Sequence, residues 1–134
     1  MTSPVRTPRE DEVLAAADEI VDAFAATDTE RYFATFAPDA TFVFHPEPAR
    51  IGSRAEYEAL WAGWLRDGWR VVDCASSDRL VQAFPGGAVF SHTVNTTTET
   101  DGAQDHAVER ETIVFRVDGD RLIAIHEHLS APTN

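Results

Sequence analysis

Three turn signals divide the second half of this chain into four segments with strand character, and this pattern constrains the fold most. Pro85-Gly86-Gly87, Asp101-Gly102 and Asp118-Gly119 each combine residues that favour tight turns. Short turns join antiparallel neighbours, so the pattern predicts a meander of long antiparallel strands. The four segments are residues 70–84, 88–99, 106–117 and 121–130.

The first half of the chain is typical of helices. Thr27 and Asp28 can cap a short second helix, residues 39–46 predict a first strand, and Ser53 can cap a third helix that ends near Gly68. The first helix is predicted from apolar residues that recur at steps of three and four, which places them on one stripe: Val13, Leu14, Ala17, Ile20, Val21 and Phe24.

The composition is that of one small domain. The chain has 134 residues, of which 43% are hydrophobic, and this is enough to fill a single core. We therefore expect one domain over residues 9–134, preceded by a flexible arm over residues 1–8. Helices followed by an antiparallel meander predict an α+β fold: a cone-shaped α+β barrel in which three N-terminal helices pack in a strongly curved, mainly antiparallel sheet.

The charge of the chain excludes some classes of partner. With 23 acidic and 11 basic residues, the formal net charge is −12, which would repel a nucleic acid backbone and an anionic membrane surface. No apolar run approaches the roughly 20 residues that cross a bilayer, and the start does not resemble a signal peptide. Cys74 is the single cysteine, so no intramolecular disulfide or cysteine zinc cluster can form. We expect a cytoplasmic protein that binds neither nucleic acid nor membrane.

Two segments carry a family resemblance. Residues 39–46, DATFVFHP, and residues 110–132, RETIVFRVDGDRLIAIHEHLSAP, resemble SnoaL-like proteins of the nuclear transport factor 2-like superfamily, as does the order of the elements. This superfamily includes ketosteroid isomerase, scytalone dehydratase, limonene epoxide hydrolase, polyketide cyclases and the association domain of calmodulin-dependent kinase. The resemblance implies a cone around one internal pocket for a small organic molecule, but it does not imply one reaction. It also implies a homodimer through the outer face of the sheet.

Alternation along the last two strands separates two sets of side chains. If Gly119 is left-handed in a three-residue loop that pairs Arg116 with Asp120, each set stays on one face. By similarity to ketosteroid isomerase, the odd-numbered face and the helices line the pocket, and the residues expected there are Ile20, Phe24, Trp61, Ile113, Phe115, Ile125 and Leu129. The even-numbered face is then the outer one, with a polar lattice of Arg110, Thr112, His126, His128 and Ser130.

Three titratable residues are candidates for catalysis. His45 precedes Pro46 at the end of the first strand, where ketosteroid isomerase-like proteins have their aspartate general base, and an imidazole exchanges protons near neutral pH. Glu111 lies near the position of that enzyme's oxyanion-hole aspartic acid. Burial in an apolar pocket can raise the pKa of Glu111 and Glu127, so that they act as acids. Alternatively, His45 only hydrogen-bonds the backbone, and Glu111 and Glu127 are ionic or cross-strand partners at the rim, an interpretation that is favoured for Glu127.

Other reactive side chains are interpreted as structural. Tyr57, Trp61 and Trp64 lie at helical spacing, which favours core packing. His92 is flanked by apolar residues on its own strand face and is interpreted as a hydrogen-bonded sheet histidine. Cys74 has no activating neighbour in the sequence, which predicts an unreactive thiol.

Three functions stay open on the sequence. The first is cofactor-free acid/base chemistry of isomerase, cyclase or dehydratase type on a small, largely apolar molecule, with His45 as base and Glu111 as acid. Ile20 stands where the isomerase has a proton-donating tyrosine, which disfavours steroid isomerisation. The second is a non-catalytic ligand-binding or association module. The third is a metal site at His126 and His128. It needs a third ligand, which His106 on the neighbouring strand could supply, but the structural interpretation is preferred. No phosphate loop or dinucleotide motif is visible, so we expect no cofactor.

Overall fold

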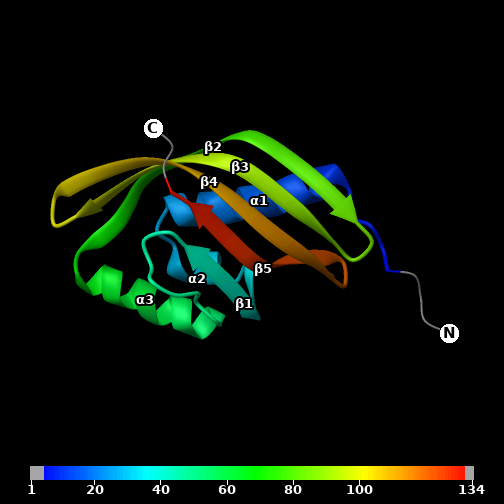
Figure 1. The fold of residues 1–134 in the computed structure, drawn as a ribbon, viewed down its shortest axis with the longest axis horizontal. Helices are drawn as coiled ribbons and strands as arrows, with labels where there is room; N and C mark the ends of the chain where they lie inside the picture. The colour runs from blue at the N-terminus through cyan, green and yellow to red at the C-terminus, as the bar shows by residue number, and fades with distance from the viewer. Residues whose placement is uncertain (1–4, 132–134) are drawn as a thin grey trace.

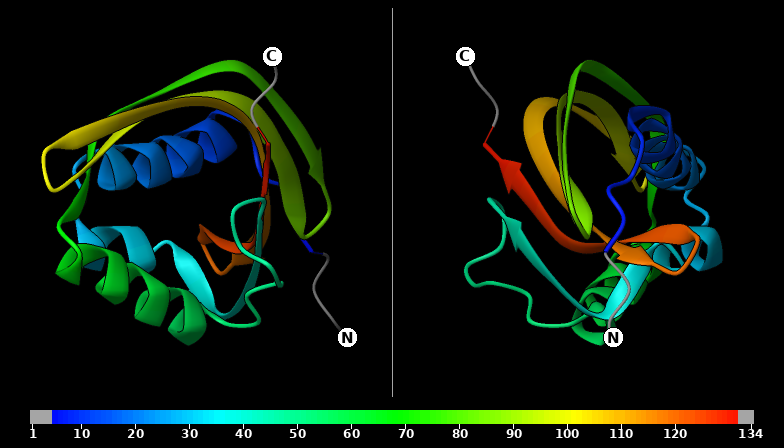
Figure 2. Two further views of the ribbon diagram at one scale, coloured as in Figure 1. Left: turned by 60° about the vertical axis from the view of Figure 1, so that its left-hand side comes forward. Right: turned by 90° about the vertical axis from the view of Figure 1, so that its right-hand side faces the viewer.

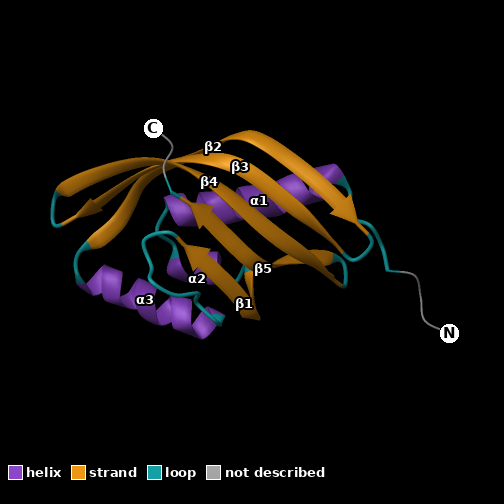
Figure 3. Cartoon of the chain, in the orientation of Figure 1, coloured by secondary structure: helices purple, strands orange, loops and turns teal. Residues whose placement is uncertain are grey.

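The computed structural model of the chain describes residues 5–131 (Figure 1). The order of helices and strands is the predicted one, and the last strand has the predicted bounds (Figure 3). In chain order the elements are α1 (Glu10–Ala25), α2 (Thr29–Phe33), β1 (Phe36–Phe44), α3 (Arg54–Arg66), β2 (Trp69–Phe84), β3 (Gly87–Thr100), β4 (Ala103–Asp118) and β5 (Arg121–Ser130).

The five strands form one mixed sheet in the order β1-β5-β4-β3-β2. β1 pairs with β5 in parallel, and the other neighbours are antiparallel. The sheet is curved and does not close on itself, and the helices lie within its curve (Figures 1 and 2). This is the α+β cone that the sequence predicts, with the hydrophobic core between the helices and the inner face of the sheet.

Side-chain caps start the two later helices, as predicted. Asp28 accepts a hydrogen bond from the backbone N–H of Arg31 at 3.2 Å, and Ser53 accepts one from Glu56 at 3.2 Å. In the described part of the chain, no helix has the length and apolarity that a bilayer crossing requires. The buried residues of α1 keep the predicted spacing and fix which side of the helix meets the sheet: Val13, Ala17, Ile20, Val21 and Ala23.

β1 begins three residues earlier than the sequence predicts. Its pairing with β5 shifts between Phe36 and Thr41, so a short irregular stretch lies between two paired ends. Pro38 falls in this stretch, on an edge strand, where the missing N–H breaks no ladder hydrogen bond. The strand therefore continues through Pro38 instead of starting after it.

The turn between β4 and β5 differs from the predicted one. Gly119 is left-handed, with φ of +64°, as expected. However, the loop holds two residues rather than three, and Arg116 lies opposite Ile123 instead of Asp120. The predicted register is therefore wrong, and next to the turn the even-numbered residues of β5 face the core.

A bulge at Ile125 restores the predicted facing along the rest of β5. Phe115 lies opposite Ala124 and Ile113 opposite Glu127, so β5 has one residue more than β4 between these pairs. Cross-strand partners share a face, and both Ala124 and Glu127 are buried. Ile125 is not among the residues that line the cavity described below, so its predicted place in the pocket wall is wrong.

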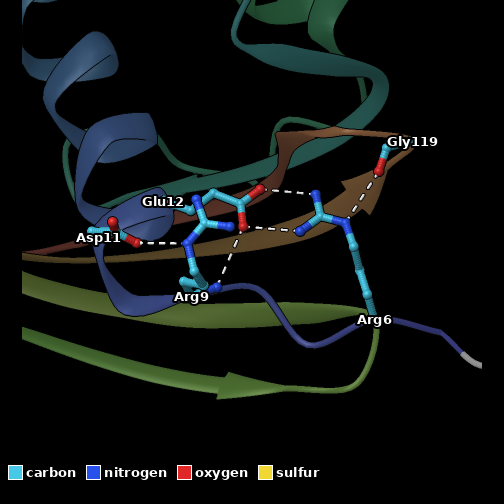
Figure 4. Close-up of polar contacts among 5 residues, drawn as sticks. All are labelled: Arg6, Arg9, Asp11, Glu12 and Gly119. Atoms are coloured by element: carbon cyan, nitrogen blue, oxygen red, sulfur yellow. Dashed lines mark hydrogen bonds and ion pairs between the residues drawn. The ribbon is translucent and has the colours of Figure 1, made fainter.

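The end of the predicted flexible arm is held against the domain. Residues 1–4 lie outside the described residues. Arg6 donates hydrogen bonds to both carboxylate oxygens of Glu12, at 2.9 and 2.8 Å, and to the carbonyl of Gly119 at 3.2 Å (Figure 4). The carbonyl of Arg6 accepts a hydrogen bond from the N–H of Gly86 at 2.9 Å. The segment just before α1 is thus fixed to two hairpin turns instead of being loose.

Candidate functional site

The concave side of the sheet encloses a cavity of about 470 Å³. Every helix and strand contributes to its walls, and most of the lining is apolar or aromatic. A volume of this size suits a small organic molecule. Its largest apolar and aromatic side chains are Ile20, Phe24, Tyr32, Phe44, Tyr57, Trp64, Trp69 and Leu129.

Some residues predicted to line this cavity lie behind its wall. Ile20, Phe24 and Leu129 line the cavity. Trp61, Ile113 and Phe115 instead belong to the buried core cluster and are not among the lining residues. On β4, the residues near the turn to β5 belong to the core, and only those toward the other end of the strand line the cavity.

Two carboxyl groups from neighbouring strands share the interior of the cavity. Glu111 comes from β4 and Glu127 from β5, and their side chains lie on the same face of the sheet. Glu127 is only 4% exposed, so it lies deep in the cavity and not at the rim. Burying an isolated carboxylate at such a depth is unfavourable. The chemistry of the site therefore depends on whether each carboxyl group is protonated and on which groups hydrogen-bond it.

A buried histidine holds Glu111. The side chain of His92, on β3, is fully buried, and its Nε2 lies 2.8 Å from Oε1 of Glu111. The Nδ1 of His92 lies 2.6 Å from the hydroxyl of Ser76 on β2. Both ring nitrogens are thus engaged, and the chain Ser76, His92, Glu111 crosses three strands. This arrangement fixes the imidazole and orients the Glu111 carboxyl.

The two carboxyl groups have pKa values displaced in opposite directions. Burial raises the pKa of Glu127 well above its ordinary value, and the negative charge of Glu111 raises it further. Burial also acts to raise the pKa of Glu111, but hydrogen bonds from Glu127 and His92 and the charge of His92 outweigh it, so this pKa is lowered. Where the pair holds one proton, that proton therefore resides on Glu127 rather than on Glu111. This reverses the sequence-based expectation that Glu111 is the acid.

Two tyrosine hydroxyls face this pair from the helices. The hydroxyls of Tyr32 on α2 and Tyr57 on α3 lie 2.9 Å apart, and both residues line the cavity. Burial and the charge of Glu127 raise both phenol pKa values well above the ordinary value, so both hydroxyls keep their protons. Within residues 5–131, the buried Oε2 of Glu127 has no hydrogen-bond partner. Buried polar atoms are normally paired, so this atom is a candidate contact for a ligand.

A second histidine and carboxylate pair lies at the edge of the cavity. His45 follows β1, and its Nε2 lies 2.5 Å from Oε2 of Glu109 on β4. The two side chains are 27% and 12% exposed, so solvent and a ligand can both reach them. His45 thus lies at the cavity edge, where the sequence places it, and Glu109 orients its imidazole.

The residues predicted to form an outer polar lattice share the convex face of the sheet, and they are Arg110, Thr112, His126, His128 and Ser130. Nδ1 of His126 lies 2.8 Å from the hydroxyl of Thr41, and the rings of His126 and His128 are 6.3 Å apart. Burial, and then the neighbouring His128, lower the pKa of His126. These side chains therefore lie away from the cavity.

The proposed third metal ligand lies elsewhere. His106 is near the tip of the β3–β4 hairpin, lines the cavity and hydrogen-bonds Asn95 at 3.1 Å. His106 lies six positions before Thr112, the cross-strand partner of His128, which is about 20 Å along the strand, so it is too far away to complete a site with His126 and His128. Among residues 5–131, no group of three or more His, Cys, Asp or Glu side chains is arranged to hold a metal ion.

Four residues of the site are absent from the sequence-based candidates: Tyr32, Tyr57, His92 and Glu109. One signal could have found His92. A two-residue turn at Asp101-Gly102 sets His92 directly opposite Glu111, which is the pairing that the structure shows. No comparable signal in the sequence brings the two tyrosines to the cavity, because their position depends on how α2 and α3 pack.

A known family matches almost the whole of this chain. The family described as SnoaL-like domain matches residues 13–134. The chain belongs to the SnoaL-like domain family. This membership agrees with the cone fold and with an internal cavity of small-molecule size. No curated protein matches the sequence.

Solved structures with the same fold are numerous. A ketosteroid isomerase-like protein from Erwinia carotovora atroseptica SCRI1043 has a TM-score of 0.80 at 16% identity, covering 92% of this chain and 96% of that chain. An NTF2-like superfamily protein from Salmonella enterica has a TM-score of 0.79 at 13% identity, covering 92% and 91%. An NTF2-like protein of unknown function in nutrient uptake from Rhodospirillum rubrum has a TM-score of 0.78 at 20% identity, covering 92% and 100%. At these identities the similarity establishes the fold alone.

Proposed function

We propose that this SnoaL-like domain binds a small, largely apolar molecule and moves a proton on it without a cofactor, as an isomerase, cyclase or dehydratase does. The observation that carries the proposal is the Glu111 and Glu127 pair, whose pKa values are displaced in opposite directions inside one apolar cavity. Titratable groups whose environments separate their pKa values supply an acid and a charged partner at the same pH.

Glu127 has the role of the acid in this proposal. Its single carboxyl proton is carried on the unpaired Oε2 when substrate is bound and donates a hydrogen bond to a carbonyl or hydroxyl oxygen of the substrate, while Glu111 stays held by His92. The hydroxyls of Tyr32 and Tyr57 remain protonated beside it and support negative charge that develops on that oxygen. Glu111, held by His92, keeps the proton on Glu127.

His45 has the role of the base. Its Nε2 is engaged by Glu109, which leaves Nδ1 to accept a proton from a carbon next to the substrate carbonyl. The electron pair of the broken C–H bond then moves into the enolate, whose oxygen Glu127 stabilises, and reprotonation at carbon completes the turnover. The sequence contains no lysine, so a covalent imine with a lysine side chain is not an alternative route.

Exchange of carbon-bound hydrogen for deuterium tests this proposal. Proton NMR in D2O would follow the signal next to the carbonyl of 2-tetralone and of a small panel of linear and cyclic ketones. We expect the protein to accelerate exchange for at least one of them, and His45→Ala and Glu127→Gln each to slow it by about 100-fold or more. Glu58→Gln, which neutralises a carboxylate on α3 that pairs with Arg54, is the matched control and should exchange at the wild-type rate.

Two results would contradict the proposed chemistry. The first is binding of the ketones without faster exchange, which would favour a non-catalytic ligand-binding module. The second is exchange that persists at the wild-type rate in both variants, which would place the proton transfer elsewhere. Circular dichroism of each variant distinguishes a chemical effect from loss of the fold.

A further inference from the structure

The charged groups around the cavity are almost all of one sign. The lining includes five carboxyl groups, and no arginine is among the lining residues of the described chain. The sequence has no lysine either. His45 and His106 lie at the rim and His92 lies against Glu111. Even with all three imidazoles protonated and Glu127 neutral, the four remaining carboxylates outnumber them. The carboxyl groups are Glu47, Asp105, Glu109, Glu111 and Glu127.

Aromatic rings line the same cavity beside these carboxylates. Phe24, Trp64 and Trp69 come from α1, α3 and β2 and are only partly buried. The rings of Trp64 and Trp69 are 5.3 Å apart, and those of Phe24 and Trp69 are 6.3 Å apart. The faces of such rings carry partial negative charge and attract cations, most strongly when the cation has lost part of its water.

One polar atom deep in the cavity has no hydrogen-bond partner among residues 5–131. Oε2 of Glu127 belongs to a side chain that is more than nine-tenths buried, lines the cavity and has no partner in the described chain. The same cavity is lined by the aromatic rings and by the rim carboxylates Glu47 and Asp105. A molecule whose neutral polar group hydrogen-bonds Oε2 of Glu127 would therefore have its other end near these rings and carboxylates.

We propose that the cavity selects substrates that carry a protonated amine on an apolar body and excludes carboxylates and phosphates. The proposal rests on the proposed function and names the substrate class for the same cavity. The reacting oxygen lies at Glu127, while the ammonium group lies among the aromatic rings and the carboxylates Glu47 and Asp105. A carboxylate in that place meets like charge and finds no arginine or lysine. The net charge of −12 also draws cations toward the protein before they bind.

Three ligands that share one skeleton test the charge preference. The probes are 2-aminotetralin, 2-tetralone and tetralin-2-carboxylate, and quenching of tryptophan fluorescence reports binding because Trp64 and Trp69 line the cavity. At pH 7.5 and low salt, we expect the amine to bind about tenfold more tightly than the ketone, and the carboxylate about tenfold more weakly. Raising the salt concentration to about 0.5 M should reduce both ratios, because the rim is open to screening.

A double variant locates the charge that is responsible. Glu47→Gln combined with Asp105→Asn should reduce the ratio of amine to carboxylate affinity by about tenfold or more. Glu58→Gln, which removes one carboxylate from the outside of α3, should leave the ratio unchanged.

The outcomes separate this inference from the proposed function. If the ketone binds and exchanges its hydrogen but the amine binds no better than the carboxylate, the charge preference is wrong and the acid/base chemistry stands. If the double variant keeps the wild-type ratio, the rim carboxylates are not the source of the preference, and the inference fails. If none of the three probes binds at millimolar concentration, both proposals are overturned.

Discussion

Replacing His92 with phenylalanine tests whether Glu111 depends on this one partner. The change keeps an aromatic ring next to Phe90, whose ring centroid lies 4.6 Å away, but removes the donor that lies 2.8 Å from Glu111. A hydrogen bond to a charged group is worth about 1.5–3 kcal/mol, and a buried charge that loses its partner costs about 3–5 kcal/mol. We therefore expect the free energy of unfolding at pH 7 to fall by about 3 kcal/mol.

The size of this loss should depend on pH. In the native chain the pKa of Glu111 is lowered, so its ionised form contributes stability above the ordinary glutamate pKa, and this contribution is lost as the pH falls through the lowered value. Without His92, burial raises the pKa of Glu111. The groups that face it provide no positive charge, and they are Glu127, Tyr32 and Tyr57. The variant then recovers stability as the pH falls and Glu111 is protonated. The gap between wild type and His92→Phe should be widest near neutral pH and narrow toward pH 5.

Urea denaturation at pH 7, 6 and 5 measures these free energies. A double-mutant cycle with Glu111→Gln shows whether the loss of stability comes from the pair of His92 and Glu111, because an uncharged amide at position 111 does not require a charged partner. We expect His92→Phe to cost less than about 1 kcal/mol in the Glu111→Gln background. A loss below about 1 kcal/mol at pH 7 in the wild-type background, or the same loss in both backgrounds, would refute the reasoning.

Three further predictions concern other parts of the molecule. Burial raises the pKa of Cys74 to about 11, so a thiol reagent at pH 8 should label the folded chain at least tenfold more slowly than the unfolded chain. Tyr57→Phe leaves the hydroxyl of Tyr32 without its partner and should lower the free energy of unfolding by about 1–2 kcal/mol, measured in urea. We also expect a homodimer through the outer sheet face, so Thr112→Arg should yield a monomer in analytical ultracentrifugation; a monomeric wild type at micromolar concentration would contradict this.

The turns made the sheet predictable. Asp101 and Gly102 both have positive φ, of 51° and 84°, and such a pair is the strongest short-range signal for a two-residue hairpin. A two-residue turn can join only neighbouring antiparallel strands, so the turn residues themselves predict the meander. The apolar stripe of α1 and the caps at Asp28 and Ser53 are equally local, which is why the helices were placed correctly.

The chemistry of the site was less predictable, because it depends on contacts between distant elements. Alternation along β4 placed Glu111 on the cavity face, but its pKa is set by burial and by hydrogen bonds from Glu127 on β5 and His92 on β3. Glu127 keeps its proton because it is buried and lies beside the negative charge of Glu111. The residues next to Glu111 and Glu127 in the sequence do not indicate this coupling. The error at Ile125 has the same origin, since no periodicity shows where a strand accepts an extra residue.

Extra residues interrupt the pairing of several strands of this sheet, including β2 between Val71 and Asp73 and β5 at Ile125. Such a residue bends its strand but leaves the paired residues on both sides in their places. Glu127 lies opposite Ile113 whether or not the strand contains Ile125, so a deletion there would straighten β5 and reshape the cavity while the acid stays inside. An insertion or deletion at these points therefore changes the shape of the cavity while the two carboxyl groups keep their places in its wall.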